Sequence, residues 1–272
     1  MMSVGGDRDR SSRALAEEAL VRLGAAAGAR SAELVLIGGL VPELLVPSDE
    51  PHQGTTDVDI LLDIGVVYDR DDRDFGWLER ALAAAGFVQQ NPNTGWRWAV
   101  EIDALPVTVE FLVDVSDNLD QEIALPGTRG LGAKNLSGPG PVLRGPRVME
   151  LRGTEIRVAG LGGYLTAKAA AVFRRRASKD FYDFAWVLVR SVRVDPVAAA
   201  ESVLGVLSPE IDRDRFQIVL AACEDFREAT STGAIAYAKG SEQAGSTEPA
   251  ERLAADAVIA VGRFRRELLR NN

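Results

Sequence analysis

Two aspartates that stand one residue apart, Asp57 and Asp59, carry the most distinctive chemistry in this sequence. They belong to the run 56–62, which reads Thr-Asp-Val-Asp-Ile-Leu-Leu. Because side chains alternate along a β-strand, both carboxylates share one face, about 6.6–7 Å apart, and Val58 and Ile60 share the other. Two carboxylates so placed suit Mg²⁺, which prefers oxygen ligands. The pattern predicts a metal-binding strand, with an ordinary solvated strand face as the alternative.

A third carboxylate is available on a second strand-like run, 106–114. Glu110 lies there between two apolar residues, so its side chain points to the face opposite theirs. If the two strands are neighbours, Glu110 joins the aspartate pair, and Asp103 and Asp114 are alternative third ligands. Two carboxylates about 4 Å apart repel each other by roughly 4 kcal/mol at an effective dielectric constant near 20, and a bound cation offsets that repulsion.

A pair of glycines, Gly38 and Gly39, directly follows the apolar run 34–37. Glycines after a strand allow the backbone to approach a ligand closely, and the exposed N–H groups of such a turn can bind phosphate oxygens. The pair is neither a Walker motif nor a GxGxxG motif. It predicts a phosphate-binding turn, with an ordinary structural turn as the alternative.

A basic group lies further along the chain, at Lys168, Arg175 and Lys179. On one continuous helix these residues occupy a single face, which suits the oxygens of a triphosphate. If Ser178 instead caps a new helix, they do not share that face. The alternative is a solvated helix face with ion pairs four residues apart, such as Arg176 with Asp180.

The elements that must position these residues indicate an α+β fold. We expect a helix over 12–27, a helix over 75–85, strands over 33–37, 57–63, 96–102 and 107–113, and a long Pro- and Gly-rich loop over 126–147. Two short strands follow, and the remainder is helical. The sequence therefore predicts an N-terminal mixed-sheet domain, 1–155, and a C-terminal helical domain, 156–272.

Composition narrows the classes of function. The 272 residues include 31 basic and 40 acidic ones, and the net charge of −9 excludes a uniformly positive surface that coats nucleic acid. The chain has one cysteine and one histidine, which excludes a disulfide framework and a zinc site built from these residues. His52 is predicted to be a loop histidine, with substrate contact as the alternative. The chain has no apolar run of about 20 residues, so we expect a cytoplasmic protein without a membrane segment.

The order of these motifs resembles the nucleotidyltransferase fold of the DNA polymerase β type. That pattern comprises a glycine pair, a DxD pair and a later acidic residue, matched here by Gly38, Gly39, Asp57, Asp59 and Glu110. Leu40 departs from it, since most members have Ser or Thr there.

A second motif narrows the resemblance. The pattern K-x-x-A-x-x-x-R-x-x-x-K-D-x-x-D is similar to the helical-domain motif of the AbiEii/AbiGii-type nucleotidyltransferases, and the matching residues are Lys168, Ala171, Arg175, Lys179, Asp180 and Asp183. Proteins of that family are often toxins of type IV toxin–antitoxin systems. The resemblance implies a nucleoside triphosphate such as ATP, Mg²⁺ or Mn²⁺, an RNA or tRNA 3′ end or a protein hydroxyl as acceptor, and an antitoxin partner.

The resulting hypothesis is a Mg²⁺-dependent nucleotidyltransferase. Asp57, Asp59 and Glu110 are the expected metal ligands and catalytic residues, with Gly38, Gly39, Lys168, Arg175 and Lys179 as the phosphate-binding residues and Thr56, Asp180 and Asp183 in support. The alternative is a nucleotide-binding interaction protein without turnover, such as an antitoxin-like partner.

Overall fold

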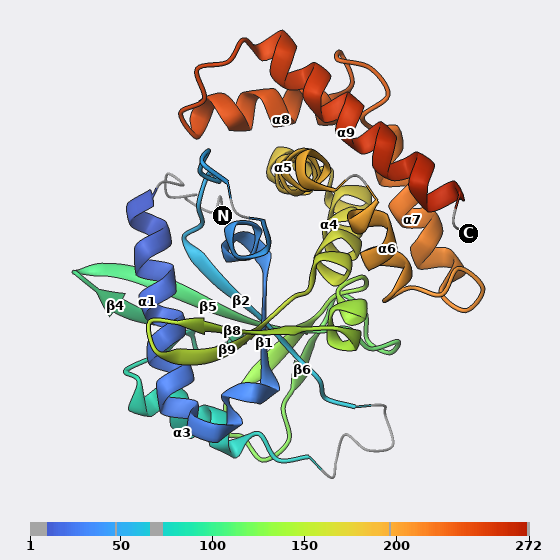
Figure 1. Ribbon diagram of the computed structural model, residues 1–272. Coiled ribbons are helices and arrows are strands. Elements are labelled where there is room, and N and C mark those ends of the chain that lie inside the picture. The colour runs from blue at the N-terminus through green and yellow to red at the C-terminus, as the bar shows by residue number, and fades with distance from the viewer. Residues whose placement is uncertain (1–9, 47, 66–72, 196, 271–272) are drawn as a thin grey trace. The chain divides into compact units, whose positions relative to one another are not determined.

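The computed structural model describes residues 10–46, 48–65, 73–195 and 197–270, and the chain divides into two compact units (Figure 1). The first unit consists of Met1–Leu40, Gly54–Ser137 and Pro146–Ala159, and the second of Val41–Gln53, Gly138–Gly145 and Gly160–Asn272. The sequence predicted a single division of the chain near residue 155. In the structure the helical unit also contains two earlier segments, 41–53 and 138–145.

The first unit is built on a mixed β-sheet. Over the described residues the sheet has nine strands, in the order β3-β4-β5-β2-β1-β9-β8, and β7 pairs with both β5 and β6. The strands are β1 (Leu34–Ile37), β2 (Asp57–Leu62), β3 (Val88–Asn91), β4 (Thr94–Ile102), β5 (Leu105–Val113), β6 (Glu122–Ala124), β7 (Gly132–Asn135), β8 (Arg147–Leu151) and β9 (Thr154–Val158). The central pair, β2 and β5, is parallel, and β1 and β4 run antiparallel to their neighbours β2 and β5.

The core of this unit follows from the alternation of side chains in β2 and β5. Val58, Ile60, Val109 and Phe111 are completely buried, while the residues between them in the sequence are half-buried. Helix α1 (Arg10–Ala27) packs against these strands and against α3 (Gly76–Ala84), with its residues Ala16, Ala19, Leu20 and Leu23 buried. Burial of each such leucine contributes about 1.5–3 kcal/mol to folding.

The segment 126–147 differs from the loop predicted for it. It contains β7 and the 3₁₀ helix η3 (Gly140–Arg144), and η3 belongs to the second unit. β7 has the sequence Gly-Ala-Lys-Asn, which carries no strand periodicity, and it forms because it pairs with the end of β5 and with β6. Tertiary pairing here overrides local propensity.

The second unit is helical. Its α-helices are α2 (Pro42–Leu45), α4 (Leu161–Arg175), α5 (Ser178–Val194), α6 (Ala198–Leu204), α7 (Arg213–Glu224), α8 (Thr232–Gln243) and α9 (Ala250–Arg270). Helix α5 is central: it contacts α4, α8 and α9, and its residues Phe181, Phe184, Trp186 and Leu188 are almost completely buried. A mixed sheet in one unit and helices in the other confirm the predicted α+β class.

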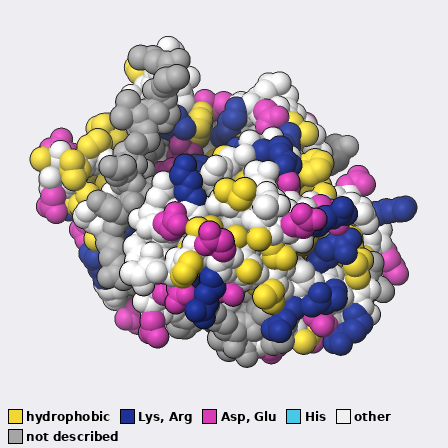
Figure 2. Space-filling view, turned by 90° about the horizontal axis from the view of Figure 1, so that it is seen from above, with side chains coloured by type: hydrophobic (Ala, Val, Ile, Leu, Met, Phe, Trp, Pro, Cys, Tyr) yellow, Lys and Arg dark blue, Asp and Glu magenta, His cyan; other side chains and the backbone are white. Residues whose placement is uncertain are grey.

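The surface carries charges of both signs. On the coloured part of the face in Figure 2, basic and acidic side chains are interspersed and do not form one continuous basic area. Among the helices described, none combines the length and the apolar character needed to cross a bilayer.

Candidate active site

Asp57 and Asp59 lie on one face of β2, and Glu110 lies on the neighbouring strand β5. The two strands pair in parallel, with Asp57 opposite Thr108 and Asp59 opposite Glu110. Paired residues in adjacent strands point to the same face, about 4.8 Å apart. All three acidic residues are half-buried. The register therefore puts the three predicted acids on one face of the sheet.

The same register separates Glu110 from its two rivals. Asp103 lies in the turn between β4 and β5, about 16 Å along the strand from Thr108, the residue that pairs with Asp57. Asp114 follows the end of β5, about 13 Å beyond Glu110. Of these three residues, Glu110 is the one paired with Asp59.

The glycine turn that follows β1 lies directly against the acidic face. Gly38 has a φ of +79°, and a Cβ added there would lie 1.8 Å from Oδ2 of Asp59. A Cβ on Gly39 would lie 2.7 Å from Cβ of Thr55. Both positions require glycine because a side chain at Gly38 would collide with Asp59 and one at Gly39 with Thr55. The pair is therefore structurally tied to the acidic strand, whichever ligand it binds.

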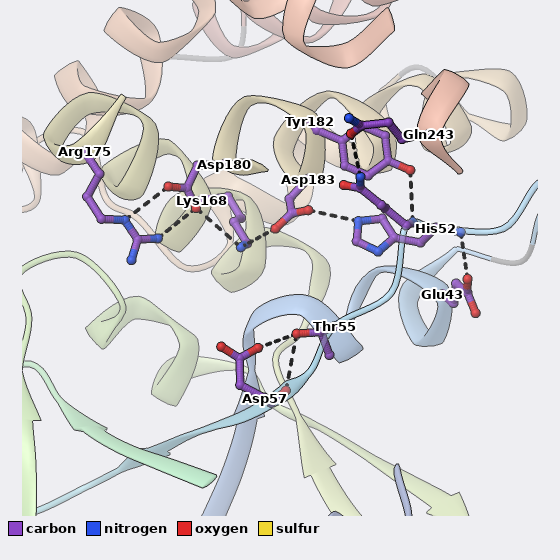
Figure 3. A network of polar contacts seen from close by, with 11 residues as sticks. Glu43, His52, Thr55, Asp57, Lys168, Arg175, Asp180, Tyr182, Asp183 and Gln243 are labelled. Atoms are coloured by element: carbon purple, nitrogen blue, oxygen red, sulfur yellow. Dashed lines mark hydrogen bonds and ion pairs between the residues drawn. The ribbon is translucent and has the colours of Figure 1, made fainter. Parts of the chain in front are cut away.

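A threonine orients the first aspartate. The buried Thr55 hydroxyl donates a hydrogen bond to Oδ1 of Asp57 (Figure 3). The sequence hypothesis assigned the supporting role to Thr56, and this contact belongs to its neighbour. Thr55 and Thr56 both precede β2, which begins at Asp57, so strand alternation does not decide between them.

Arg97, which the sequence reasoning missed, binds the third acid. Its Nε and Nη2 lie 2.9 and 2.8 Å from Oε1 of Glu110, and its guanidinium carbon lies 4.2 Å from the centre of the Trp96 ring. Arg97 on β4 is the direct antiparallel partner of Glu110 on β5. The turn at residues 103 and 104 could have revealed this contact. When residues are counted outward from the turn along both strands, Arg97 falls opposite Glu110.

The carboxylates fit a divalent ion only in part. As the side chains stand, the described ranges hold no group of three or more His, Cys, Asp or Glu residues able to bind a metal ion. Asp57 and Asp59 provide oxygen donors on one face, the chemistry that Mg²⁺ requires. Glu110 instead binds a guanidinium. The residues thus fit an ion held by the two aspartates and do not fit the predicted three-carboxylate set.

In the helical unit, the predicted basic stripe is interrupted. Helix α4 ends at Arg175, Arg176 adopts a left-handed conformation with φ of +50°, and α5 begins at Ser178. Lys168 and Arg175 therefore lie on one helix and Lys179 on the next, so the single continuous face is wrong. The break matches the alternative that the sequence offered, a new helix that starts near Ser178.

The residues of the second motif bind one another (Figure 3). Nζ of the buried Lys168 lies 2.6 Å from Asp183 and 3.8 Å from Asp180, and both aspartates are completely buried. Arg175 binds both carboxylate oxygens of Asp180, at 2.7 and 3.1 Å. Lys179 is exposed. Two buried aspartates thus compensate the charges of Lys168 and Arg175, and the cluster joins α4 to α5.

His52 extends this cluster within the same unit. Its Nε2 lies 3.0 Å from Oδ1 of Asp183, and its ring lies 5.0 Å from that of Tyr182. The histidine lies in a loop, as predicted, but it is 2% exposed, so this loop residue is buried in the core of the unit. Burial, reinforced by the charge of Asp183, raises the pKa of Tyr182 well above its usual value. The protonated Tyr182 hydroxyl accepts a hydrogen bond from the backbone N–H of Gln53.

Comparison with known proteins gives little direct guidance. No family model matches the chain, and no curated protein matches it. Among solved structures, the chain is similar to a provisionally assigned nucleotidyltransferase from H. pylori, with 12% identity and a TM-score of 0.47 over 96% of this chain and 97% of the other. Similarity at this level assigns no activity and no residue role to this chain.

Proposed function

We propose that this chain is a divalent-ion-dependent nucleotidyltransferase, which moves a nucleoside monophosphate from a nucleoside triphosphate to a hydroxyl group. One observation carries the proposal: Asp57 and Asp59 share a sheet face with Glu110 beside them, and the Gly38 backbone lies against Asp59. A solvated strand face would explain the aspartates alone. It would not require a glycine turn within contact distance of one of their carboxylates.

Each residue of this face has a defined task. Asp57, oriented by Thr55, and Asp59, positioned by the turn, hold Mg²⁺ or Mn²⁺. The ion, when bound, neutralises the charge of the phosphates. Backbone N–H groups of Gly38 and Gly39 donate to phosphate oxygens. The acceptor hydroxyl attacks the α-phosphorus and its oxygen forms the new P–O bond. The bond between the α-phosphorus and the pyrophosphate oxygen breaks, pyrophosphate leaves, and the hydroxyl proton passes to solvent.

The basic residues divide into two groups. The exposed Lys179 is the first candidate for contact with the triphosphate, and Arg175, which is half-exposed, could make such contact only beside or in place of its pairing with Asp180. Lys168 is buried between Asp180 and Asp183, so we assign these three residues to holding α4 against α5. A buried lysine already paired with carboxylates is a poor phosphate ligand, because phosphate must compete with an existing ion pair.

The acceptor and the biological role rest on the family resemblance. We propose an RNA or tRNA 3′ end as the first acceptor to test and a protein hydroxyl as the second. ATP is one candidate donor among the nucleoside triphosphates. A toxin role, with an antitoxin partner, predicts that induced expression arrests growth and that Asp57→Asn relieves the arrest.

A transfer assay tests the enzyme directly. The protein is incubated with Mg²⁺, each labelled nucleoside triphosphate, and total RNA or total cell protein. We expect Asp57→Asn and Asp59→Asn to lower label transfer by at least about 10²-fold, since each removes a ligand charge from the reacting centre. Asp103→Asn is the matched control, because it removes a carboxylate from the same unit outside this face. Asp103→Asn should retain wild-type transfer.

The same experiment separates the enzyme from its main rival. Tight nucleotide binding without transfer to any acceptor would favour a non-catalytic nucleotide-binding partner protein. Wild-type transfer by both aspartate variants would refute the site. Equal loss in all three variants would indicate a general effect on stability.

A further inference from the structure

We propose that Arg97 takes the place of a second divalent ion, so that the acidic face of the free protein holds one ion through Asp57 and Asp59. Glu110 then acts as the partner of Arg97 and is not a metal ligand. The inference deepens the proposed function and rests on its metal dependence. It follows from the disagreement between the predicted three-carboxylate set and the contacts that Glu110 makes.

The position of Arg97 is fixed by the backbone. The β4–β5 hairpin pairs Arg97 with Glu110 directly, just as β2 and β5 pair Asp59 with Glu110. Glu110 therefore stands between a cation on one neighbouring strand and an acid on the other. Trp96, the residue before Arg97, supports the guanidinium with its ring, 4.2 Å away.

The Glu110 carboxylate in this ion pair is more shielded from solvent than the Arg97 guanidinium. The Glu110 side chain is 16% exposed, whereas that of Arg97 is 45% exposed. Two guanidinium nitrogens approach one carboxylate oxygen at 2.9 and 2.8 Å, the range of charge-assisted hydrogen bonds. An ion that recruits Glu110 must displace these contacts.

The charges on this face also balance with one ion. Among the contacts described above, three carboxylates and one guanidinium carry a net charge of about −2, which one divalent ion would neutralise. A second divalent ion bound to Glu110 in the free protein would place two positive charges next to the Arg97 guanidinium, and these like charges would repel each other. The described residues accordingly show no three-membered ligand group on this face. Arg97 thus supplies the positive charge next to Glu110.

Manganese binding without nucleotide tests the inference. Mn²⁺ titration of the full chain, followed by electron paramagnetic resonance and calorimetry, should give one ion per chain. Asp59→Asn should abolish binding at that site. Glu110→Gln should keep one ion, with affinity within about threefold of wild type. Arg97→Met should raise the affinity roughly tenfold or add a second ion, because it removes a like charge and releases a carboxylate.

A double-variant comparison isolates the effect. In the Arg97→Met background, Glu110→Gln should cancel the gain in Mn²⁺ affinity or the additional ion. The same Glu110→Gln change should have little effect on Mn²⁺ binding when Arg97 is present. Arg97→Lys keeps the charge and should bind Mn²⁺ as wild type does. This control tests whether the positive charge at position 97 sets the Mn²⁺ affinity.

Each other outcome is decisive. Two ions on the wild-type chain, one of them lost in Glu110→Gln, would overturn the inference and leave the proposed transferase standing. An unchanged affinity in Arg97→Met would also overturn it. The expected Mn²⁺ pattern without nucleotidyl transfer would refute the proposed function alone. A wild-type chain that binds no Mn²⁺ without nucleotide would overturn the inference and leave the proposed transferase standing, because substrate phosphates can supply further ligands to the ion.

Discussion

Replacement of Gly38 by alanine is the sharpest test of how the glycine turn supports the acidic face. The added Cβ would lie 1.8 Å from Oδ2 of Asp59, whereas ordinary van der Waals contact begins near 3.4 Å. The carboxylate must therefore move by about 1.6 Å, the difference between these two distances. Gly38 also has a φ of +79°, a conformation that costs alanine roughly 1–2 kcal/mol.

These two effects can be separated with a matched glycine. Gly86 has the same φ of +79°, belongs to the same unit, and has no neighbouring atom within 4 Å of an added Cβ. Gly86→Ala therefore carries the backbone cost without the collision. Gly86→Ala should lose about 1–2 kcal/mol in free energy of unfolding, measured by urea titration. Gly38→Ala should lose at least as much, because the collision with Asp59 adds to the backbone cost.

Only Gly38→Ala should affect the chemistry. A displacement of about 1 Å at a reacting centre can cost about 10²-fold in rate, so we expect nucleotidyl transfer to fall by about that factor. Mn²⁺ affinity should fall by at least roughly tenfold, since one ligand has moved. If Gly38→Ala retains the Mn²⁺ affinity and transfer rate of Gly86→Ala, Asp59 is not positioned by this turn or does not hold the ion.

Three further predictions concern the helical unit. Asp183→Asn should lower the free energy of unfolding in urea by about 3–5 kcal/mol, because it leaves the buried Lys168 charge short of its closest partner, and a loss below about 1 kcal/mol would contradict this. Burial raises the pKa of Cys223 to about 12, so a thiol reagent at pH 8 should label it at least about 10²-fold more slowly in the native chain than in urea, and equal rates would refute its burial. Hydrogen bonding by Arg144 lowers the pKa of Asp212, so that carboxylate stabilises the fold above its unfolded pKa near 4, and the stabilisation is lost as pH falls through the lowered folded pKa. Asp212→Asn should therefore cost about 1 kcal/mol at pH 7 and progressively less below pH 4, and a cost independent of pH would argue against this ion pair.

The acidic face was predictable because its signals are local. Alternation in β2 and β5 placed Asp57, Asp59 and Glu110 on faces opposite buried residues, and the structure supplied the adjacency that the sequence left conditional. Arg97 escaped notice because its role depends on cross-strand register. A single turn sets that register, and a periodicity pattern along one strand does not contain it.

The helical cluster was only partly predictable. The spacing of Lys168, Arg175 and Asp183 identified residues that lie together, but their interpretation as a phosphate-binding stripe assumed one continuous helix. The left-handed Arg176 breaks that helix. The contact between His52 and Asp183 joins residues 131 positions apart, and nothing local to either residue encodes a pairing over that separation.

The alternation of the chain between its two units limits how this protein can be divided. A cut after residue 155 leaves the segment 41–53 on one fragment, while Asp183 and Tyr182, which bind His52 and Gln53, remain on the other. Neither half could therefore be gained, duplicated or exchanged as one uninterrupted stretch of coding sequence. We expect recombination at the midpoint of the chain to fail.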